Sequence, residues 1–474
     1  KMKQNETNDV AYDYLNSFIY STPWIDKVRR IDDLASITKS QVIEFASKNY
    51  TDNYVIVYKR LGKDTTIAKV EKPPITPLEL NRKDESVFMK EFNSTESENI
   101  KPVFVNYKEK IKRKTLGSGV ELNYIKNTTN ELFNLTYLID MGQAHNKKLA
   151  LAVNYLPFLG TSKYSPAQLQ EEFYKLGINM DVSTGQRRSY VFISGLEKSL
   201  EQGIKLLEHV LAEVQPDRKS YDEYVEGILK KRTDSKLNKG QILYGGLRSY
   251  GTHGSKSPFT DVLSEKELKA IDPAELTAII KKICNYKHYL FYYGKNDAEY
   301  AGNVIDKYHT VKGSLLDYPD EKKYPELDIN ENKVYFAHYD MVQAEILILA
   351  KDELFNKDLM PYASMFGSYF GSGLSSIMFQ EIRESKGLAY SAYATYSIPG
   401  QPDKYHYLFA YLGTQVNKLH EAVPAALQIL SNMPEAEKQF IAAKESVIKN
   451  IETERITKSS IFWSSLSNKD RGID

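Results

Sequence analysis

The alternation of apolar and polar residues along the chain contains two internal repeats, and each repeat predicts the same run of elements twice. In the first, residues 33–58 align with residues 267–292 at a shift of 234 positions. In both copies a Thr or Asp (Thr38 and Asp272) precedes residues with helical apolar periodicity, and a short apolar run follows. The repeat therefore predicts the closing helix and strand of one kind of domain, present twice, with the first of these strands at 53–58.

The second repeat has a shift of 210 positions and covers the middle of a domain. Asn146 aligns with Asn356, and Gly177 aligns with Gly387. Each copy predicts a strand, two helices in succession, and a turn at the glycine that leads into alternating strands. The expected helices and the strand after the turn span 147–158, 165–176 and 179–184 in the first copy, and 357–369, 375–386 and 389–396 in the second.

The two repeats divide the chain into four segments. The expected boundaries are 1–62 for the end of one domain, 63–112 for a linker, 113–312 for a complete domain and 313–474 for most of another. The linker is rich in Pro, Ser, Asn and Glu, as exposed connections are. Under the shift of 210 the closing strand of the last domain would fall beyond Asp474, and the chain begins with Lys rather than Met. The sequence is therefore expected to be a piece of a longer protein.

Composition and charge exclude several classes of protein. The chain has 474 residues, of which 42% are hydrophobic and 26% charged, so it can bury several cores and is not expected to be disordered. Its 63 Lys and Arg against 62 Asp and Glu leave a net charge of +1, which offers no basic field to nucleic acid. No apolar run reaches the roughly 18 residues of a membrane span. The single cysteine, Cys284, excludes an internal disulfide and a Cys-based zinc knuckle.

Common catalytic motifs are absent from the sequence. No two of the eight histidines lie four residues apart, so there is no His-x-x-x-His zinc pair on a helix. Glu208 and His209 have a lysine, Lys205, at the position of the first ligand of an inverted motif, which indicates an ordinary amphipathic helix. The glycine-rich stretch 366–376 follows a helix rather than a strand, which favours a flexible loop between two helices over a phosphate site.

One segment does suggest chemistry. Arg383 lies near the end of a predicted helix, Gly387 turns the chain, and Tyr390 is expected to begin a strand. This order can bring a guanidinium and a phenol to one place, where both donate hydrogen bonds to a peptide carbonyl or an oxyanion. The alternative is structural: Arg383 interacts with the helix dipole and Tyr390 packs within the strand.

The same segment, FQEIRESKGLAYSAYATYS (379–397), resembles the zinc metallopeptidases of the insulinase/pitrilysin family (M16), whose later domains carry an Arg-x₆-Tyr pair. TLGSGVELNYIKN (115–127) resembles the family's opening strand, and residues 158–184 resemble the core of its fold. The resemblance implies an α+β fold of repeated M16-type α/β sandwich domains, each an antiparallel-rich sheet packed by helices. Two homologous domains and part of a preceding one would be present. It also implies that Arg383 and Tyr390 are catalytic and substrate-binding residues.

The zinc motif of the family has no match in this chain. Alignment of residues 113–312 with the family pattern places Leu151, Asn154 and Tyr155 where the His, Glu and His of His-x-x-Glu-His would stand. The distal Glu position falls within the cationic stretch 229–232, and Glu226 is the nearest carboxylate. These side chains cannot hold zinc or activate water. The resemblance therefore implies that zinc is bound by an N-terminal half of the full-length protein and that this chain holds no metal.

Together the residues and the resemblance predict the C-terminal, substrate-enclosing half of a zinc-dependent oligopeptide endopeptidase, inactive alone. The alternative is a non-catalytic binding or scaffold protein of the same fold. The implied partners are a peptide substrate and the N-terminal half, without nucleic acid, and a homodimer remains an open alternative. Family relatives suggest a periplasmic or secreted location.

Overall fold

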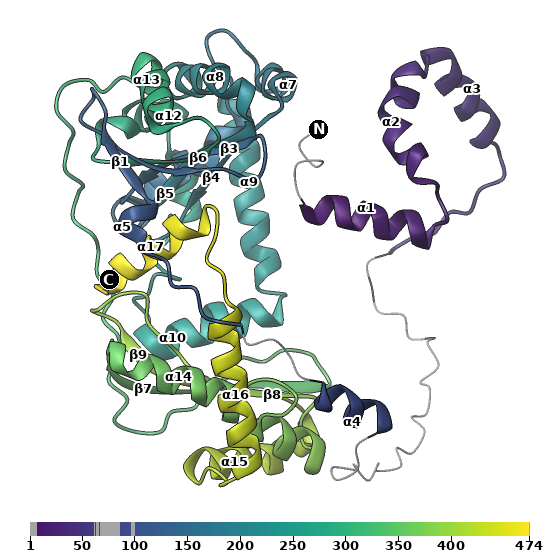
Figure 1. Ribbon diagram of the computed structural model, residues 1–474. Helices are drawn as coiled ribbons and strands as arrows, with labels where there is room; N and C mark the ends of the chain where they lie inside the picture. The colour runs from purple at the N-terminus through teal and green to yellow at the C-terminus, as the bar shows by residue number, and fades with distance from the viewer. Residues whose placement is uncertain (1–6, 61, 63–65, 67–85, 96–99, 474) are drawn as a thin grey trace. The chain divides into compact units, whose positions relative to one another are not determined.

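The computed structural model describes residues 7–60, 62, 66, 86–95 and 100–473 (Figure 1). The chain divides into two compact units, one ending at Ile100 and one beginning at Lys101. Most of the predicted linker, 63–112, lies outside the described residues.

The first unit is helical and contains no strand among its described residues. Its helices are α1 (Thr7–Ile19), α2 (Trp24–Ser36), α3 (Lys39–Asn49) and α4 (Val87–Ser94). Thr38 caps α3 through a reciprocal capping box with Gln41, as the sequence predicts. The strand predicted at 53–58 is wrong: these residues form no strand pairing with any residue that the structure describes, and Val55 is 90% exposed. An isolated strand leaves its backbone groups unpaired, so an apolar run alone does not make one.

The second unit contains a six-stranded sheet whose order is β1-β2-β6-β3-β5-β4. Only β2 and β6 pair in parallel, and every other neighbouring pair is antiparallel. Strand β6 is the closing strand predicted by the first repeat, and it lies between β2 and β3. The bounds are β1 (Lys112–Thr115), β2 (Glu121–Lys126), β3 (Leu132–Ile139), β4 (Ile178–Thr184), β5 (Ser189–Leu196) and β6 (Tyr289–Gly294).

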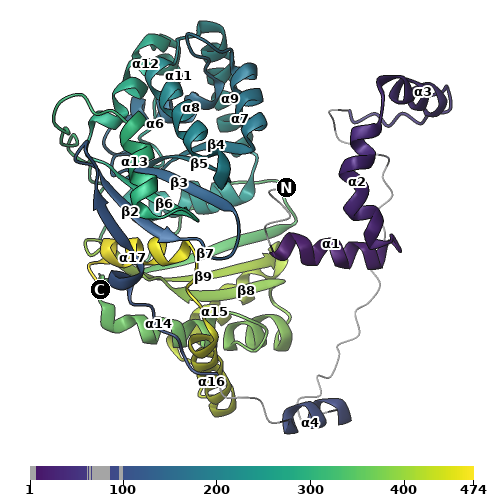
Figure 2. The same cartoon turned by 45° about the horizontal axis from the view of Figure 1, so that its top comes forward.

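Helices cover one face of this sheet and enclose the largest core of the described residues (Figure 2). Helices α6 and α7 end as the second repeat predicts, with a 3₁₀ turn over Leu156–Phe158 after α6 and Gly177 in the left-handed region after α7. The helices on this side are α6 (Lys147–Tyr155), α7 (Pro166–Leu176), α8 (Leu200–Glu213), α9 (Arg218–Ser235), α12 (Pro273–Lys282) and α13 (Ala298–Tyr308).

The opposite face of the sheet is covered by the last helix of the chain, α17 (Ser460–Arg471) (Figure 2). Phe462 stacks on Phe291 of β6 with ring centroids 4.0 Å apart. At the edge of this contact Arg188 pairs with Asp140 and with Asp470, the latter at 2.6 Å. The C-terminal helix thus packs on the sheet formed by residues 112–294.

The second sheet has three antiparallel strands in the order β7-β9-β8: β7 (Gln343–Leu354), β8 (Ser391–Tyr396) and β9 (Tyr405–Gln415). It is packed by α14 (Met360–Phe366), the π-helical turns Gly367–Gly371 and Phe379–Ser385, α15 (Leu419–Ser431) and α16 (Glu437–Thr453). The expected loop at 366–376 is thus partly helical. A Cβ at Gly371 would lie 1.8 Å from the carbonyl oxygen of Ala394, so only glycine fits this close approach to β8.

The predicted fold class is confirmed, since both sheets are antiparallel-rich and packed by helices. No helix among the described residues is long and apolar enough to cross a membrane.

Candidate functional site

Arg383 and Tyr390 lie on either side of a tight helix-to-strand turn. Arg383 belongs to the π-helical turn Phe379–Ser385, and Gly387 follows in the left-handed region with φ of 58°. A glycine at this position closes the helix without strain. The backbone N–H of Tyr390 donates to the carbonyl of Gly413 on β9 at 2.9 Å, so Tyr390 is anchored directly before β8 begins at Ser391.

This turn brings the two predicted side chains together. The guanidinium carbon of Arg383 lies 5.2 Å from the ring centroid of Tyr390 and 4.6 Å from that of Phe379. Both distances fall within the range of cation–π attraction. The only ion pair of Arg383 among the described residues is a long one, 3.5 Å, to its neighbour Glu384. The guanidinium is therefore held by aromatic rings and retains N–H groups for another acceptor.

The exposure of the two side chains decides between a Tyr390 that can bind a ligand and a Tyr390 that packs within the strand. Tyr390 is 74% exposed, and the Arg383 side chain is 37% exposed. The alternative in which Tyr390 packs within the strand is therefore wrong, whereas Ala392 and Ala394 of the same strand are buried. A phenol and a guanidinium at one accessible place can both donate hydrogen bonds to a carbonyl oxygen.

The positions that align with the zinc motif lie on α6 and do not fit a metal. Leu151 and Tyr155 are buried, and the hydroxyl of Tyr155 donates to the carbonyl of Asp217 at 2.8 Å. Burial raises the pKa of Tyr155 well above that of a free phenol, so the side chain is neutral. The Asn154 side chain is exposed, but an amide is a poor zinc ligand. No His, Cys or carboxylate stands at these three positions, and no step of a zinc mechanism can be assigned to them.

A cleft of about 780 Å³ opens beside these positions, between α6 and α9. Leu151 and Asn154 line it, together with Lys231 and Arg232 from the cationic stretch on α9. Arg232 donates to the carbonyl of Leu263 at 2.7 Å, which fixes it as part of the wall. The cleft occupies the place where the zinc motif would lie, but its charged lining is largely cationic.

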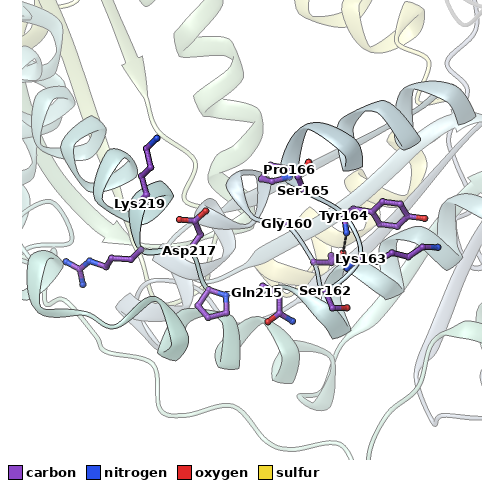
Figure 3. Close-up of a pocket in the computed structure, with 12 residues that line it drawn as sticks. Gly160, Ser162, Lys163, Tyr164, Ser165, Pro166, Gln215, Asp217 and Lys219 are labelled. Atoms are coloured by element: carbon purple, nitrogen blue, oxygen red, sulfur yellow. Dashed lines mark hydrogen bonds between the residues drawn. The ribbon is translucent and has the colours of Figure 1, made fainter.

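A second cleft, of about 630 Å³, lies between the loop before α7 and the loop before α9 (Figure 3). Its polar groups serve the fold: Asp217 caps α9 through the N–H of Ser220, and Thr161 bonds to His209 at 2.9 Å. Arg383 and Tyr390 do not line it.

One group of potential metal ligands among the described residues was not predicted from the sequence. Cys284, His288 and His309, all in the second unit, place a thiol and two imidazoles within 4.8 Å of one another. The available signal was the Cys-x-x-x-His spacing of the first two residues before a strand. His309 could not be added from sequence, because it is 21 residues further along and is brought near by α13.

Comparisons with known proteins bear on the family and the fold of this chain. Residues 287–447 match the family model described as the Peptidase M16 inactive domain. An uncharacterized zinc protease of Rickettsia felis is 23% identical over 320 residues, which cover 63% of this chain and 76% of that protein. A similar protein of Rickettsia bellii is 22% identical over 337 residues, 64% of this chain and 77% of that protein.

Solved structures show the same fold. The peptidase M16 inactive domain of Pseudomonas fluorescens superposes with a TM-score of 0.58 at 15% identity, over 76% of this chain and 87% of that one. The periplasmic protease PqqL of Escherichia coli superposes with a TM-score of 0.63 at 12% identity, over 93% of this chain but only 47% of its own. These matches bear out the predicted resemblance: residues 287–447 match the family model of the M16 inactive domain, and the fold of the chain is similar to that of solved M16 peptidases.

Proposed function

We propose that this chain is the C-terminal, substrate-enclosing half of a zinc-dependent oligopeptide endopeptidase. The observation that carries the proposal is the accessible pair of Arg383 and Tyr390. The guanidinium carbon of Arg383 lies 5.2 Å from the centroid of the Tyr390 ring. The match of residues 287–447 to an inactive M16 domain supports it, as does the lack of metal ligands at Leu151, Asn154 and Tyr155. An N-terminal half of the full-length protein would supply zinc and the general base.

In this proposal Arg383 and Tyr390 bind the substrate next to the scissile bond. The peptide carbonyl accepts hydrogen bonds from the phenol and from the guanidinium, which lies over the aromatic rings of Tyr390 and Phe379. As the carbonyl oxygen gains negative charge, both hydrogen bonds strengthen, so the pair stabilises the transition state more than the bound substrate. Such donors, fixed in advance by backbone contacts, need little reorganisation during the reaction.

The substrate and the location follow from the same proposal. Enclosure between two halves favours unfolded or short peptides over large folded proteins. The ferredoxin protease FusC, solved in complex with Arabidopsis ferredoxin, superposes on 91% of this chain with a TM-score of 0.62 at 11% identity. A small protein is therefore within the range of substrates we propose. The periplasmic relative PqqL supports a location outside the cytoplasm.

Complementation with a separately produced N-terminal half tests the proposal. We expect no cleavage of a quenched fluorescent peptide by this chain alone and recovery of turnover on mixing the two halves. A mixture in which this chain carries Tyr390→Phe should bind the peptide but turn it over slowly. Cleavage by the isolated chain in the presence of a chelator would show that the chemistry does not depend on the other half.

A non-catalytic binding or scaffold protein remains the second candidate, favoured by the replaced zinc motif on α6. It predicts peptide binding without turnover even when the N-terminal half is present. A His-x-x-Glu-His motif in the sequence upstream of this chain would decide against it.

A further inference from the structure

A cluster of potential metal ligands, which includes neither Arg383 nor Tyr390, lies between the six-stranded sheet and the helices that cover it. Cys284 belongs to the 3₁₀ turn after α12, His288 directly precedes β6, and His309 ends α13. The two histidines are 5% and 2% exposed, and Cys284 is partly buried. We propose that Cys284, His288 and His309 bind one Zn²⁺ ion as a structural site, independently of the proposed peptidase function.

The hydrogen bonds behind the two imidazoles orient them as metal ligands. The Nδ1 of His288 lies 2.7 Å from the carbonyl oxygen of Tyr286, which can only accept, so this nitrogen carries the proton. The Nδ1 of His309 lies 2.8 Å from a carboxylate oxygen of Glu208. Metal-binding histidines have this arrangement, in which the second nitrogen donates to a carbonyl or a carboxylate and fixes the ring.

A further contact holds Glu208 in its role behind His309. The hydroxyl of Tyr137 donates to the same carboxylate oxygen at 2.6 Å, and the Tyr137 ring meets the His309 ring edge-on with centroids 5.4 Å apart. The carboxylate oxygen of Glu208 therefore has two donors, Tyr137 and His309, which fix its position behind the His309 ring.

The two remaining imidazole nitrogens face each other. The Nε2 atoms of His288 and His309 are 3.0 Å apart. With both Nδ1 atoms protonated, each Nε2 presents a lone pair, and two lone pairs at this distance repel unless a cation lies between or beside them. A proton shared by the pair would satisfy them, and so would a metal ion bound by both.

The third ligand favours zinc over a shared proton. Two imidazole ligands of tetrahedral zinc lie about 3.3 Å apart, close to the 3.0 Å between the Nε2 atoms. Cys284 would complete three protein ligands after an inward shift of its sulfur of up to about 1 Å, because the three atoms now lie within 4.8 Å. A proton shared by the two imidazoles leaves the Cys284 sulfur without a role in the cluster, whereas zinc would bind all three atoms. Water or another group would occupy the fourth position.

Such an ion would join three elements at the base of the domain: the end of α12, the start of β6 and the end of α13. Since β6 is the central strand that pairs with β2 and β3, the site would stabilise the sheet itself.

Titration with Co²⁺ as a spectroscopic substitute for zinc tests the proposal. The chain is stripped with chelator and dialysed, and Co²⁺ is added while absorbance and elemental metal content are followed. We expect one ion per chain and a thiolate-to-cobalt charge-transfer band, displaced by Zn²⁺. Because Cys284 is the only cysteine in the sequence, this band can arise from no other residue.

Variants assign the ligands. Cys284→Ser changes one atom and should abolish the charge-transfer band, and Glu208→Gln should weaken metal binding by about 10–100-fold through His309. His420→Gln, which changes an exposed histidine outside the cluster, should leave the charge-transfer band and the metal affinity unchanged. Circular dichroism would establish that each variant is folded. A folded wild-type chain that binds no metal, or binding unaffected by Cys284→Ser, would overturn the proposal and leave a proton-sharing histidine pair.

Discussion

The two copies related by the shift of 210 share a glycine turn but use it for different purposes. In both, a helix ends at a left-handed glycine, with φ of 64° at Gly177 and 58° at Gly387. The shift places Arg383 on Phe173, which is 6% exposed and belongs to the core. The same turn thus presents an apolar side chain inward in the first copy and a cation at an accessible place in the second. The side chain at this position, rather than the turn itself, therefore decides whether the copy can bind a ligand there.

The first helix of each copy can be compared at the positions that align with the zinc motif. Leu151, Asn154 and Tyr155 in the first copy align with Pro361, Ser364 and Met365 in the second. Neither set contains a zinc ligand of the kind that such sites require. The copies therefore share the lack of a metal motif on this helix, whereas the turn that follows offers exposed hydrogen-bond donors in the second copy.

Exchanging the side chains of Phe173 and Arg383 between the two copies should destabilise the fold at position 173. Phe173→Arg would place an unpaired charge in the core and remove a buried ring, so we expect a loss of at least about 4 kcal/mol in the free energy of unfolding. Urea unfolding followed by circular dichroism measures it. The reverse change, Arg383→Phe, should alter stability by no more than about 0.5 kcal/mol, since its site is accessible. Equal losses in the free energy of unfolding would show that positions 173 and 383 are buried to the same extent.

Removal of the donors should affect turnover in the second copy. In the complex with the N-terminal half, we expect Tyr390→Phe and Arg383→Ala each to lower kcat by about 10²–10³, the cost of one lost oxyanion donor, or roughly 2.7–4 kcal/mol. KM should change much less, because the interaction is strongest in the transition state. Steady-state kinetics on a quenched peptide measures both constants.

Two matched control variants test whether kcat falls because a donor at this site is lost or because any exposed hydroxyl or charge is lost. Tyr362 is 73% exposed, nearly as much as Tyr390, so Tyr362→Phe removes an equivalent hydroxyl elsewhere in the same domain. Lys386→Ala removes a charge three residues from Arg383. Both controls should retain normal kcat. Normal kcat in folded Tyr390→Phe would remove the proposed role of the phenol.

The helix that replaces the zinc motif should depend on its buried hydroxyl. Tyr155→Phe removes one of the two hydrogen bonds that the carbonyl of Asp217 accepts, the one at 2.8 Å, and we expect a loss of about 2 kcal/mol in stability. Tyr174→Phe, at an 84% exposed position on α7, should have no measurable effect. Thermal unfolding of the two variants compares them. An unchanged melting temperature in Tyr155→Phe would mean that water replaces the hydroxyl.

Local features of the fold could be predicted from sequence, whereas features that depend on distant segments could not. The cap at Thr38 and the glycine turns follow from nearby residues, and so does the proximity of Arg383 and Tyr390 across seven positions. The strand at 53–58 could not be judged, because strand formation requires a neighbour that the run itself does not specify. The approach of His309 to His288 depends on the packing of α13 against α8, which no local pattern contains.

The smallest expected effect concerns Asp261, which joins the two copies. Its carboxylate lies 2.8 Å from Lys147 at the start of α6 and 2.6 Å from Lys322 in the segment that leads to the second copy. Tyr324 donates to it at 2.7 Å. These hydrogen bonds hold the pKa of Asp261 well below its usual value, and the side chain is only 18% exposed. The charged form is thus favoured by folding.

Asp261→Asn should therefore lower stability by about 1.5 kcal/mol near neutral pH, where the charge-assisted hydrogen bonds are intact. Because the folded pKa lies below the unfolded value of about 3.9, the contribution is complete above that value and is lost as the pH falls toward the folded pKa. Urea unfolding of wild type and variant should show a constant difference from pH 7 to about pH 5 that shrinks below about pH 4. Asp317→Asn is the control, because Asp317 is 84% exposed in its pair with Lys287 and such pairs contribute little. A wild-type advantage that persists undiminished in strong acid would show that Asp261 acts through packing rather than through its charge.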